Sequence, residues 1–127
     1  MATRVNDLIK LLHKSSLVRS VRIVNYDETP AGKLELKIRC RLVGNYKLQM
    51  WLHEEANFRN DAYQLFTDHP ILRWDNSPHY PDLSTAPHHF HNEKGDVAAS
   101  PLSGKLLQDL KSVLRYIEKW LSERTAA

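Results

Sequence analysis

The sequence predicts an α+β domain, with an antiparallel sheet of about four to five strands, a helix at each end and a long loop rich in proline and histidine. Three observations support this fold class. Apolar and charged residues alternate along 33–42, as in a strand with one buried face. Both ends of the chain instead repeat apolar residues at helical spacing. The segment 71–91 holds four of the seven histidines and three of the six prolines. Separate runs of strands and helices are typical of α+β proteins.

Size and composition indicate a single domain over residues 1–127. The chain is 42% hydrophobic and 26% charged, as in globular proteins that bury one core. No apolar run approaches the roughly 20 residues of a membrane-spanning helix, and the N-terminus lacks a signal-peptide pattern. We therefore expect a cytoplasmic protein without a membrane partner. The lone cysteine, Cys40, excludes a disulfide scaffold and a four-cysteine zinc site.

The N-terminal region predicts a helix followed by a strand. Over residues 4–14, one apolar face is formed by Val5, Leu8, Ile9 and Leu12. This spacing is that of an amphipathic helix, and Thr3 suits its N-cap. The β-branched residues of 17–26 predict a strand, and 27–32 has the composition of a turn.

The middle of the chain predicts two hairpins. In the first, strand 34–42 is followed by Gly44 and Asn45, which suit a two-residue turn with positive φ, and the returning strand alternates again. In the second, residues 58–66 and 71–75 flank a short turn. The sheet would bury one face of these strands under the helices.

The other face of the sheet is predicted to be basic. Its outward positions are Lys37, Arg39, Arg41, Lys47, Trp51 and His53. Cations beside an aromatic ring suit a phosphate backbone and a stacked base. We therefore predict that this surface binds nucleic acid, together with Tyr80 of the loop. Alternatively, outward charges serve only solubility and edge protection.

The segment after Asn76 is predicted to be a loop. Pro78, Pro81 and Pro87 fix φ and remove backbone donors, so this segment should be neither a helix nor a central strand. Residues 92–100 have the composition of a turn. The final helix should begin at Ser100 or Ser103, and its apolar stripe comprises Leu106, Leu107, Leu110, Val113, Leu114, Ile117 and Leu121.

The histidines of this loop are predicted to be catalytic. Two histidines can share the roles of base and acid at neutral pH. In an extended segment His89 and His91 point the same way and His88 points the other way. The working pair is therefore either His89 with His91, or His88 with His79 brought back by the loop.

Two further side chains complete the predicted site. Arg73 can stabilise the charge that develops on a phosphorane, and Asp75 can orient an imidazole. Attack of an RNA 2′-hydroxyl on its own phosphate needs a base, an acid and a cation, and no metal. We therefore predict a metal-independent ribonuclease without a cofactor.

Three alternatives remain open. A His-x-His pair with a third His or Asp could hold zinc or another divalent ion, which would indicate a metal-dependent hydrolase. The histidines could instead only brace a proline-rich turn, with Asp75 and Asn76 as turn caps. In the third, the protein binds without catalysis, and the loop aromatics Trp74, Tyr80 and Phe90 carry the contact.

One pattern in this stretch is specific to a family. The pattern is RxDNxPHxP followed by PHHxH, formed by Arg73, Asp75, Asn76, Pro78, His79 and Pro81, then by Pro87, His88, His89 and His91. It resembles the TumE family of toxin-antitoxin toxins. The family often has a second histidine where Tyr80 stands and a lysine where Phe90 stands. The resemblance implies a growth-inhibiting toxin and, as its partner, a DNA-binding antitoxin encoded beside it. RNA as the substrate is our inference from the residues, and the oligomeric state is open, with a homodimer among the options.

Overall fold

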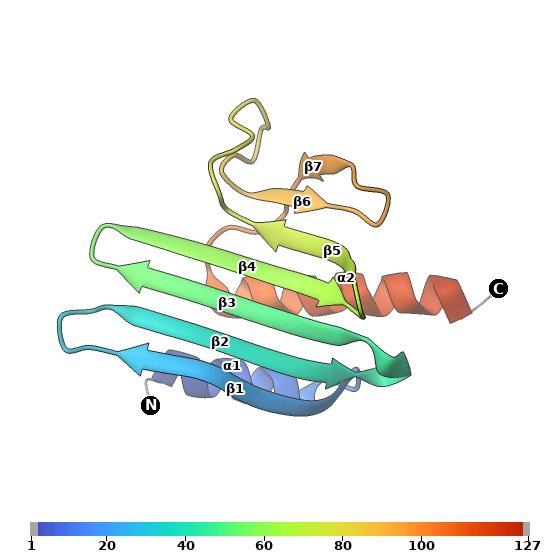
Figure 1. Cartoon of the computed structure of the whole chain (residues 1–127), viewed down its shortest axis with the longest axis horizontal. Coiled ribbons are helices and arrows are strands. Elements are labelled where there is room, and N and C mark those ends of the chain that lie inside the picture. The colour runs from blue at the N-terminus through green and yellow to red at the C-terminus, as the bar shows by residue number, and fades with distance from the viewer. Residues whose placement is uncertain (1–2, 126–127) are drawn as a thin grey trace.

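The computed structural model describes residues 3–125. Its elements in chain order are α1 (Thr3–Lys14), β1 (Val18–Glu28), β2 (Leu34–Leu42), the short 3₁₀ turn η1 (Val43–Asn45), β3 (Lys47–Glu55), β4 (Phe58–Phe66), β5 (Pro70–Asp75), β6 (His89–His91), β7 (Val97–Ala99) and α2 (Leu106–Thr125). The seven strands form one antiparallel sheet in the order of the chain (Figure 1). Within 3–125, neither helix combines the length and the hydropathy needed to cross a bilayer.

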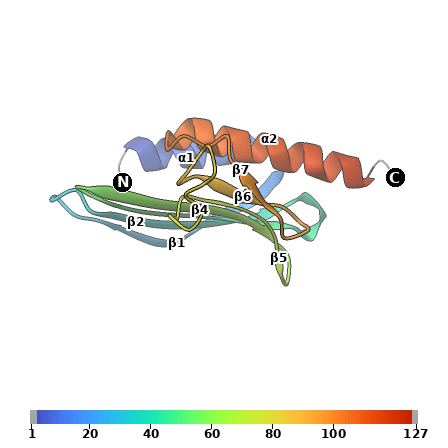
Figure 2. The ribbon, with the colours of Figure 1, turned by 90° about the horizontal axis from the view of Figure 1, so that it is seen from above.

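Both helices lie on one face of the sheet, and the opposite face is open (Figure 2). The covered face is apolar because every second residue of β2 and β3 is buried. These side chains pack against α1 and against an α2 stripe that includes Leu110, Val113 and Ile117, all fully buried. The predicted α+β class with a helix at each end is confirmed.

The predicted number of strands was wrong, because the sheet has seven rather than four or five. The additional strands β6 and β7 have three residues each. Pro87 is the last proline of the loop, so from His88 onward the backbone N–H groups can again join a ladder. The expectation that no interior strand follows Asn76 is therefore corrected, since β6 pairs with both β5 and β7.

The first hairpin turn is one residue longer than predicted. Gly44 and Asn45 both have the expected positive φ, at 72° and 65°. The loop also includes Val43, because the backbone N–H of Leu42 donates to the carbonyl of Tyr46.

Both helix starts also differ from the prediction. Thr3 is already helical in α1 rather than its cap. Helix α2 begins at Leu106, later than either predicted serine. The Asp109 carboxylate accepts hydrogen bonds from the backbone N–H groups of Ser103 and Gly104, and these bonds hold the approach to α2 in a non-helical turn.

Cross-strand pairing arranges the open face in two neighbouring rows. The first, here the guanidinium row, comprises Arg22, Arg39, Gln49, Gln64, Arg73 and His91. The second, here the tryptophan row, comprises Asn25, Lys37, Trp51, Ala62, Asp75 and His89. Side chains of paired residues point to the same side of a sheet. The two rows therefore bring two of the predicted basic residues onto one surface with four of the predicted catalytic residues, namely Lys37 and Arg39 with Arg73, Asp75, His89 and His91.

Candidate active site

Asp75 is the centre of the candidate site. It ends β5 on the open face, and its Oδ1 accepts hydrogen bonds from Ser77 N (3.0 Å) and Ser77 Oγ (2.8 Å). Its Oδ2 accepts a hydrogen bond from Arg73 Nε at 2.8 Å. An aspartate that accepts from the backbone two residues onward makes a turn of its own, which ends the strand before Pro78. The predicted turn-capping role of Asp75 is thus present together with its contact to Arg73.

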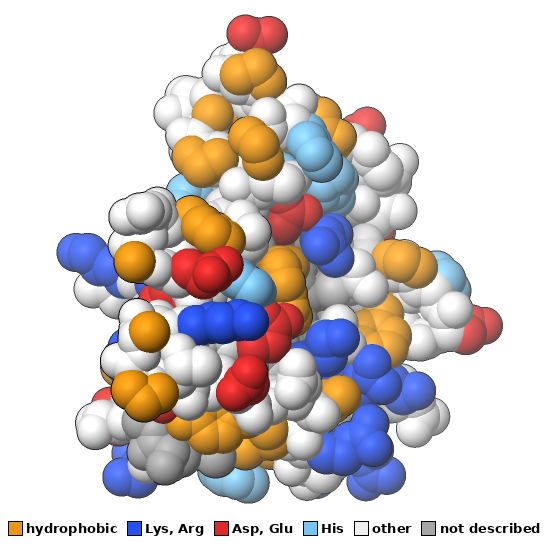
Figure 3. All heavy atoms as spheres, turned by 60° about the vertical axis from the view of Figure 1, so that its left-hand side comes forward, with side chains coloured by type: hydrophobic (Ala, Val, Ile, Leu, Met, Phe, Trp, Pro, Cys, Tyr) orange, Lys and Arg blue, Asp and Glu red, His pale blue; other side chains and the backbone are white. Residues whose placement is uncertain are grey.

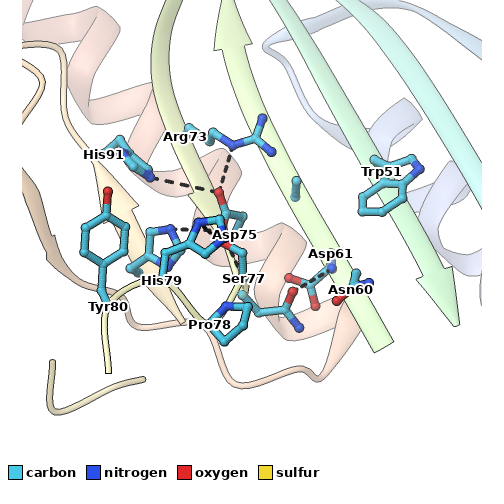
Figure 4. A pocket seen from close by; sticks show the side chains of 13 residues that line it. Trp51, Asn60, Asp61, Arg73, Asp75, Ser77, Pro78, His79, Tyr80 and His91 are labelled. Carbon is cyan, nitrogen blue, oxygen red and sulfur yellow. Dashed lines mark hydrogen bonds and ion pairs between the residues drawn. The ribbon is translucent and has the colours of Figure 1, made fainter. Parts of the chain in front are cut away.

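Two histidines of β6 also contact the Asp75 carboxylate. His89 Nε2 lies 2.9 Å from Oδ1, and His91 Nε2 lies 4.0 Å from Oδ2 (Figure 4). The other nitrogen of His89, Nδ1, donates to the carbonyl of Pro87 at 3.0 Å. The two rings share a face, as predicted, because they stand two residues apart on a strand. The His89 side chain is only 1% exposed, whereas that of His91 is 30% exposed.

The environment favours an ionised Asp75 and a neutral His91. Burial opposes ionisation of Asp75, but the hydrogen bonds from Arg73 and Ser77 outweigh it and lower the pKa of Asp75 below its ordinary value. Burial, and then the nearby His89, lower the pKa of His91. A neutral imidazole at the edge of a cavity can accept a proton.

The loop folds back over these two histidines. The Tyr80 ring packs against His89 and His91, with centroid separations of 4.7 Å and 5.9 Å. His79 Nδ1 lies 3.4 Å from Ser77 Oγ, and the His79 side chain is exposed. The loop therefore adds a third imidazole and a phenol to the same site.

A cavity of about 540 Å³ opens beside this cluster. Its lining includes His79, Tyr80, His89, His91, Arg73, Asp75, Ala62 of β4 and Trp51 of β3. A second hollow of about 190 Å³ adjoins it and is lined by Lys37, Gln49 and Gln64. Because both hollows share Trp51, Ala62 and Arg73, they form one continuous depression, here called the groove.

The remaining predicted cations lie on β2 and β3. Arg39, Arg41 and Lys47 line a further hollow of about 340 Å³ together with Arg22 of β1, which was not predicted. In Figure 3, Lys and Arg side chains gather at the lower right, and histidine side chains lie above them. His53 differs from these cations, because Glu35 and Glu55 contact its two ring nitrogens.

His88 is the predicted catalytic residue that the structure does not bring to the groove. Its Nδ1 atom is buried and has no hydrogen-bond partner within the described part of the chain. It lies near Asp61, whose pKa is raised by burial, and His88 only partly offsets this rise. Asp61 is buried and pairs with the core residue Leu52, although it also borders the cavity beside Asp75. His88 and His89 are consecutive at the start of β6 and point to opposite faces.

Some residues of the site did not stand out in the sequence. Ser77 holds Asp75 through two hydrogen bonds, and its signal was only its place between an aspartate and a proline. Gln64 accepts a hydrogen bond from Arg73 Nη1 at 3.0 Å. Ala62 is a small residue at an outward position of β4, and it lines the groove. Its role can be recognised only once the structure shows which residues flank it.

Three of these side chains could also hold a metal ion. One ligand atom each from Asp75, His89 and His91 lies within 4.8 Å of the others. Two imidazoles and a carboxylate are ligands that suit zinc and related ions. The hydrogen bond from His89 Nδ1 to a backbone carbonyl is a common support for a histidine ligand.

Fold and site together define an α+β protein that carries imidazoles, a carboxylate and a guanidinium on an open, cationic sheet face. The family model described as toxin TumE matches residues 8–121, nearly the whole chain. The chain therefore belongs to the TumE family, and the resemblance of the histidine segment is confirmed. Membership makes it a toxin of a toxin-antitoxin system and implies an antitoxin partner. No curated protein and no solved structure matches the chain.

Proposed function

We propose that this toxin cleaves RNA by metal-independent transfer of protons between its histidines and the substrate. The observation that carries the proposal is the cluster around Asp75, where a guanidinium and two imidazoles meet one carboxylate. The cluster lies at the end of a surface lined with Lys and Arg, which suits an approaching phosphate backbone.

His91 is proposed as the base and His79 as the acid. His91 removes the proton of a ribose 2′-hydroxyl, and the freed oxygen attacks the adjacent phosphorus. The bond from phosphorus to the 5′-oxygen breaks, and His79 gives its proton to that leaving oxygen. A 2′,3′-cyclic phosphate and a 5′-hydroxyl result. Arg73, whose side chain is 42% exposed, can contact the phosphorane while it keeps its bond to Asp75.

Asp75 and His89 are proposed as positioning residues. His89 is almost fully buried, and both of its ring nitrogens face oxygen atoms of the protein. His89 therefore holds the Asp75 carboxylate against β6. Asp75 in turn orients Arg73, and the ring contact of Tyr80 with both histidines holds the loop over them.

The proposal is tested with purified toxin, end-labelled RNA and an excess of EDTA. We expect cleavage by the wild type, products with a 2′,3′-cyclic phosphate, and a loss of about 100-fold or more in His79→Ala and His91→Ala. His69→Ala is the matched control, because His69 is exposed in the turn between β4 and β5. Intact RNA with the wild type, while expression still arrests growth, would contradict cleavage and indicate a toxin that acts by occupancy.

A metal-dependent hydrolase is the second candidate, favoured by the convergence of Asp75, His89 and His91. In that case EDTA should abolish cleavage, and one defined divalent ion should restore it. Retention of full activity after EDTA treatment and dialysis would exclude this candidate.

The partners follow from the family and from the surface. We propose that the antitoxin is a DNA-binding protein, as the resemblance implies. We also propose RNA as the substrate, since Gln49 of the groove pairs with Arg39, which lines the cationic hollow of β1 to β3. Light scattering of the purified toxin would show whether it forms a homodimer.

A further inference from the structure

We propose that the groove accepts one unpaired RNA nucleotide, whose base lies over Ala62 against the Trp51 indole while its phosphate contacts Arg73. This inference rests on the proposed function for the choice of RNA as the ligand. It adds the class of RNA, which is single-stranded rather than duplex, and the residues that select it.

The tryptophan row provides a slot of the required width. Trp51 on β3, Ala62 on β4 and Asp75 on β5 are direct cross-strand neighbours. Adjacent strands lie about 4.8 Å apart, so the backbones that carry Trp51 and Asp75 are separated by roughly 10 Å. Only the methyl group of Ala62 rises between them. Figure 4 shows Trp51 across β4 from the Asp75 cluster, with open space between.

The aromatic wall of this slot is held in place. Trp51 Nε1 donates a hydrogen bond to Glu35 Oε1 at 2.9 Å, which ties the indole to β2. Its ring also contacts His53, with centroids 6.2 Å apart. A fixed ring of this kind suits base stacking, which tolerates any base because every base has a π-face.

The guanidinium row lies beside the slot and supplies its positive charge. Arg39 donates to Gln49 Oε1 at 2.7 Å, and Arg73 donates to Gln64 Oε1 at 3.0 Å. These glutamine oxygens are uncharged and orient both guanidinium groups, and Arg73 also forms an ion pair with Asp75. Lys37 pairs directly with Trp51 on the other side of the slot. The sugar-phosphate backbone can therefore follow cations while a base enters the slot.

A duplex does not meet these requirements. Its bases are paired and stacked inside the helix, so none can lie flat against Trp51 without being extruded. An unpaired nucleotide presents a free base and a flexible backbone. The geometry of the slot therefore selects single-stranded segments.

The test measures binding of a short, fluorescently labelled RNA that is 2′-O-methylated throughout. Methylation removes the attacking hydroxyl, so binding is observed independently of cleavage. We expect Ala62→Leu, which fills the slot, and Trp51→Ala to weaken binding of the single strand by about tenfold or more, and Trp51→Phe to restore most of it. Ala56→Leu is the matched control, because Ala56 is exposed in the turn between β3 and β4.

The outcomes separate this inference from the proposed function. Binding by Ala62→Leu equal to that of the wild type, with the variant shown to be folded by its thermal transition, would overturn the inference. Equal affinity for the single strand and for the same strand annealed to its complement would also overturn it. Selective binding of the single strand without cleavage of unmodified RNA would leave the inference standing and contradict only the ribonuclease.

Discussion

Asp75 and Asp61 lie next to each other across β4 and β5, and their surroundings differ in kind. Asp75 faces the open side of the sheet and accepts hydrogen bonds from Arg73 and from Ser77. Asp61 faces the covered side and is 2% exposed, and within residues 3–125 neither of its carboxylate oxygens has a hydrogen-bond partner. Arg59 Nε is the ion-pair partner of Asp61, at 3.9 Å, too far for a hydrogen bond.

The pKa values of the two acids shift in opposite directions. Burial raises the pKa of Asp61. At Asp75 burial acts the same way, but the donors outweigh it and the pKa falls. Each acid has an arginine and a histidine nearby, so residue types alone do not distinguish them. What distinguishes them is the number of hydrogen-bond donors within reach, which is three at Asp75 and none at Asp61 within residues 3–125.

The largest expected effect comes from removing a histidine near each acid, which tests whether the two surroundings have different roles. We expect His91→Ala to reduce RNA cleavage by about 100-fold or more, since it removes the proposed base. His88→Ala should keep cleavage within about threefold of the wild type, because His88 does not reach the groove. Initial rates on labelled RNA check both. A variant at 88 as inactive as the variant at 91 would contradict the division of roles.

Removal of each carboxylate should next show opposite effects on stability. Asp75→Ala leaves Arg73 and the buried His89 without their shared partner, so we expect a loss of about 3 kcal/mol in the free energy of unfolding. Urea unfolding monitored by circular dichroism measures it. An unchanged unfolding midpoint would show that the Asp75 contacts do not stabilise the fold.

Asp61→Asn should stabilise the protein at neutral pH. The substitution removes a buried charge that lacks hydrogen bonds and keeps nearly the same volume, so we expect a gain of about 1 kcal/mol. The same urea experiment applies, with Asp68→Asn as a control on an exposed aspartate in the β4–β5 turn. A destabilised Asp61→Asn variant would mean that the ion pair with Arg59 outweighs the cost of burying this carboxylate.

The smallest expected effect is the pH dependence of the stability differences between the wild type and the variants Asp61→Asn and Asp75→Ala. The folded-state pKa of Asp61 lies above 3.8, so the unfolded chain ionises first as pH rises and the wild type loses stability that Asp61→Asn keeps. For Asp75 the folded-state pKa lies below 3.8, so its stabilisation is present above that value and is lost as pH falls through the folded-state pKa. The Asp61 difference should therefore shrink as the pH falls toward 3.8, whereas the Asp75 difference should shrink only below 3.8. Unfolding midpoints from neutral to acidic pH would check this, and a difference that grows with acid would contradict it.

Period-two alternation made much of the fold and the site predictable. The strict pattern of 34–42 specified which face carries Lys37 and Arg39, and the burial of β2 agrees. The same rule placed His89 and His91 on one face and His88 on the other. Asp75 was expected to orient an imidazole, and its contact with His89 is present. Its contact with Arg73 was not predicted.

The rest depended on pairings that no local pattern contains. Strands β6 and β7 are too short for alternation to be recognised, and the ladders of β6 with β5 and of β7 with β6 exist only because the loop returns. Ala62 is unremarkable in the sequence, yet its place between Trp51 and Asp75 shapes the groove. Asp61 likewise reads as an ordinary strand residue until α2 and the loop cover it.

Strand β6 carries two of the three imidazoles of the site, His89 and His91, on only three residues. Near the end of a sheet so short a ladder can open locally while the long hairpins of β1 to β4 stay intact. Separation of β6 from β5 would take His89 and His91 away from Asp75 without unfolding the molecule. Amide hydrogen exchange should accordingly be faster in β6 than in β3. A denaturant concentration too low to unfold the core should already abolish the activity of the toxin.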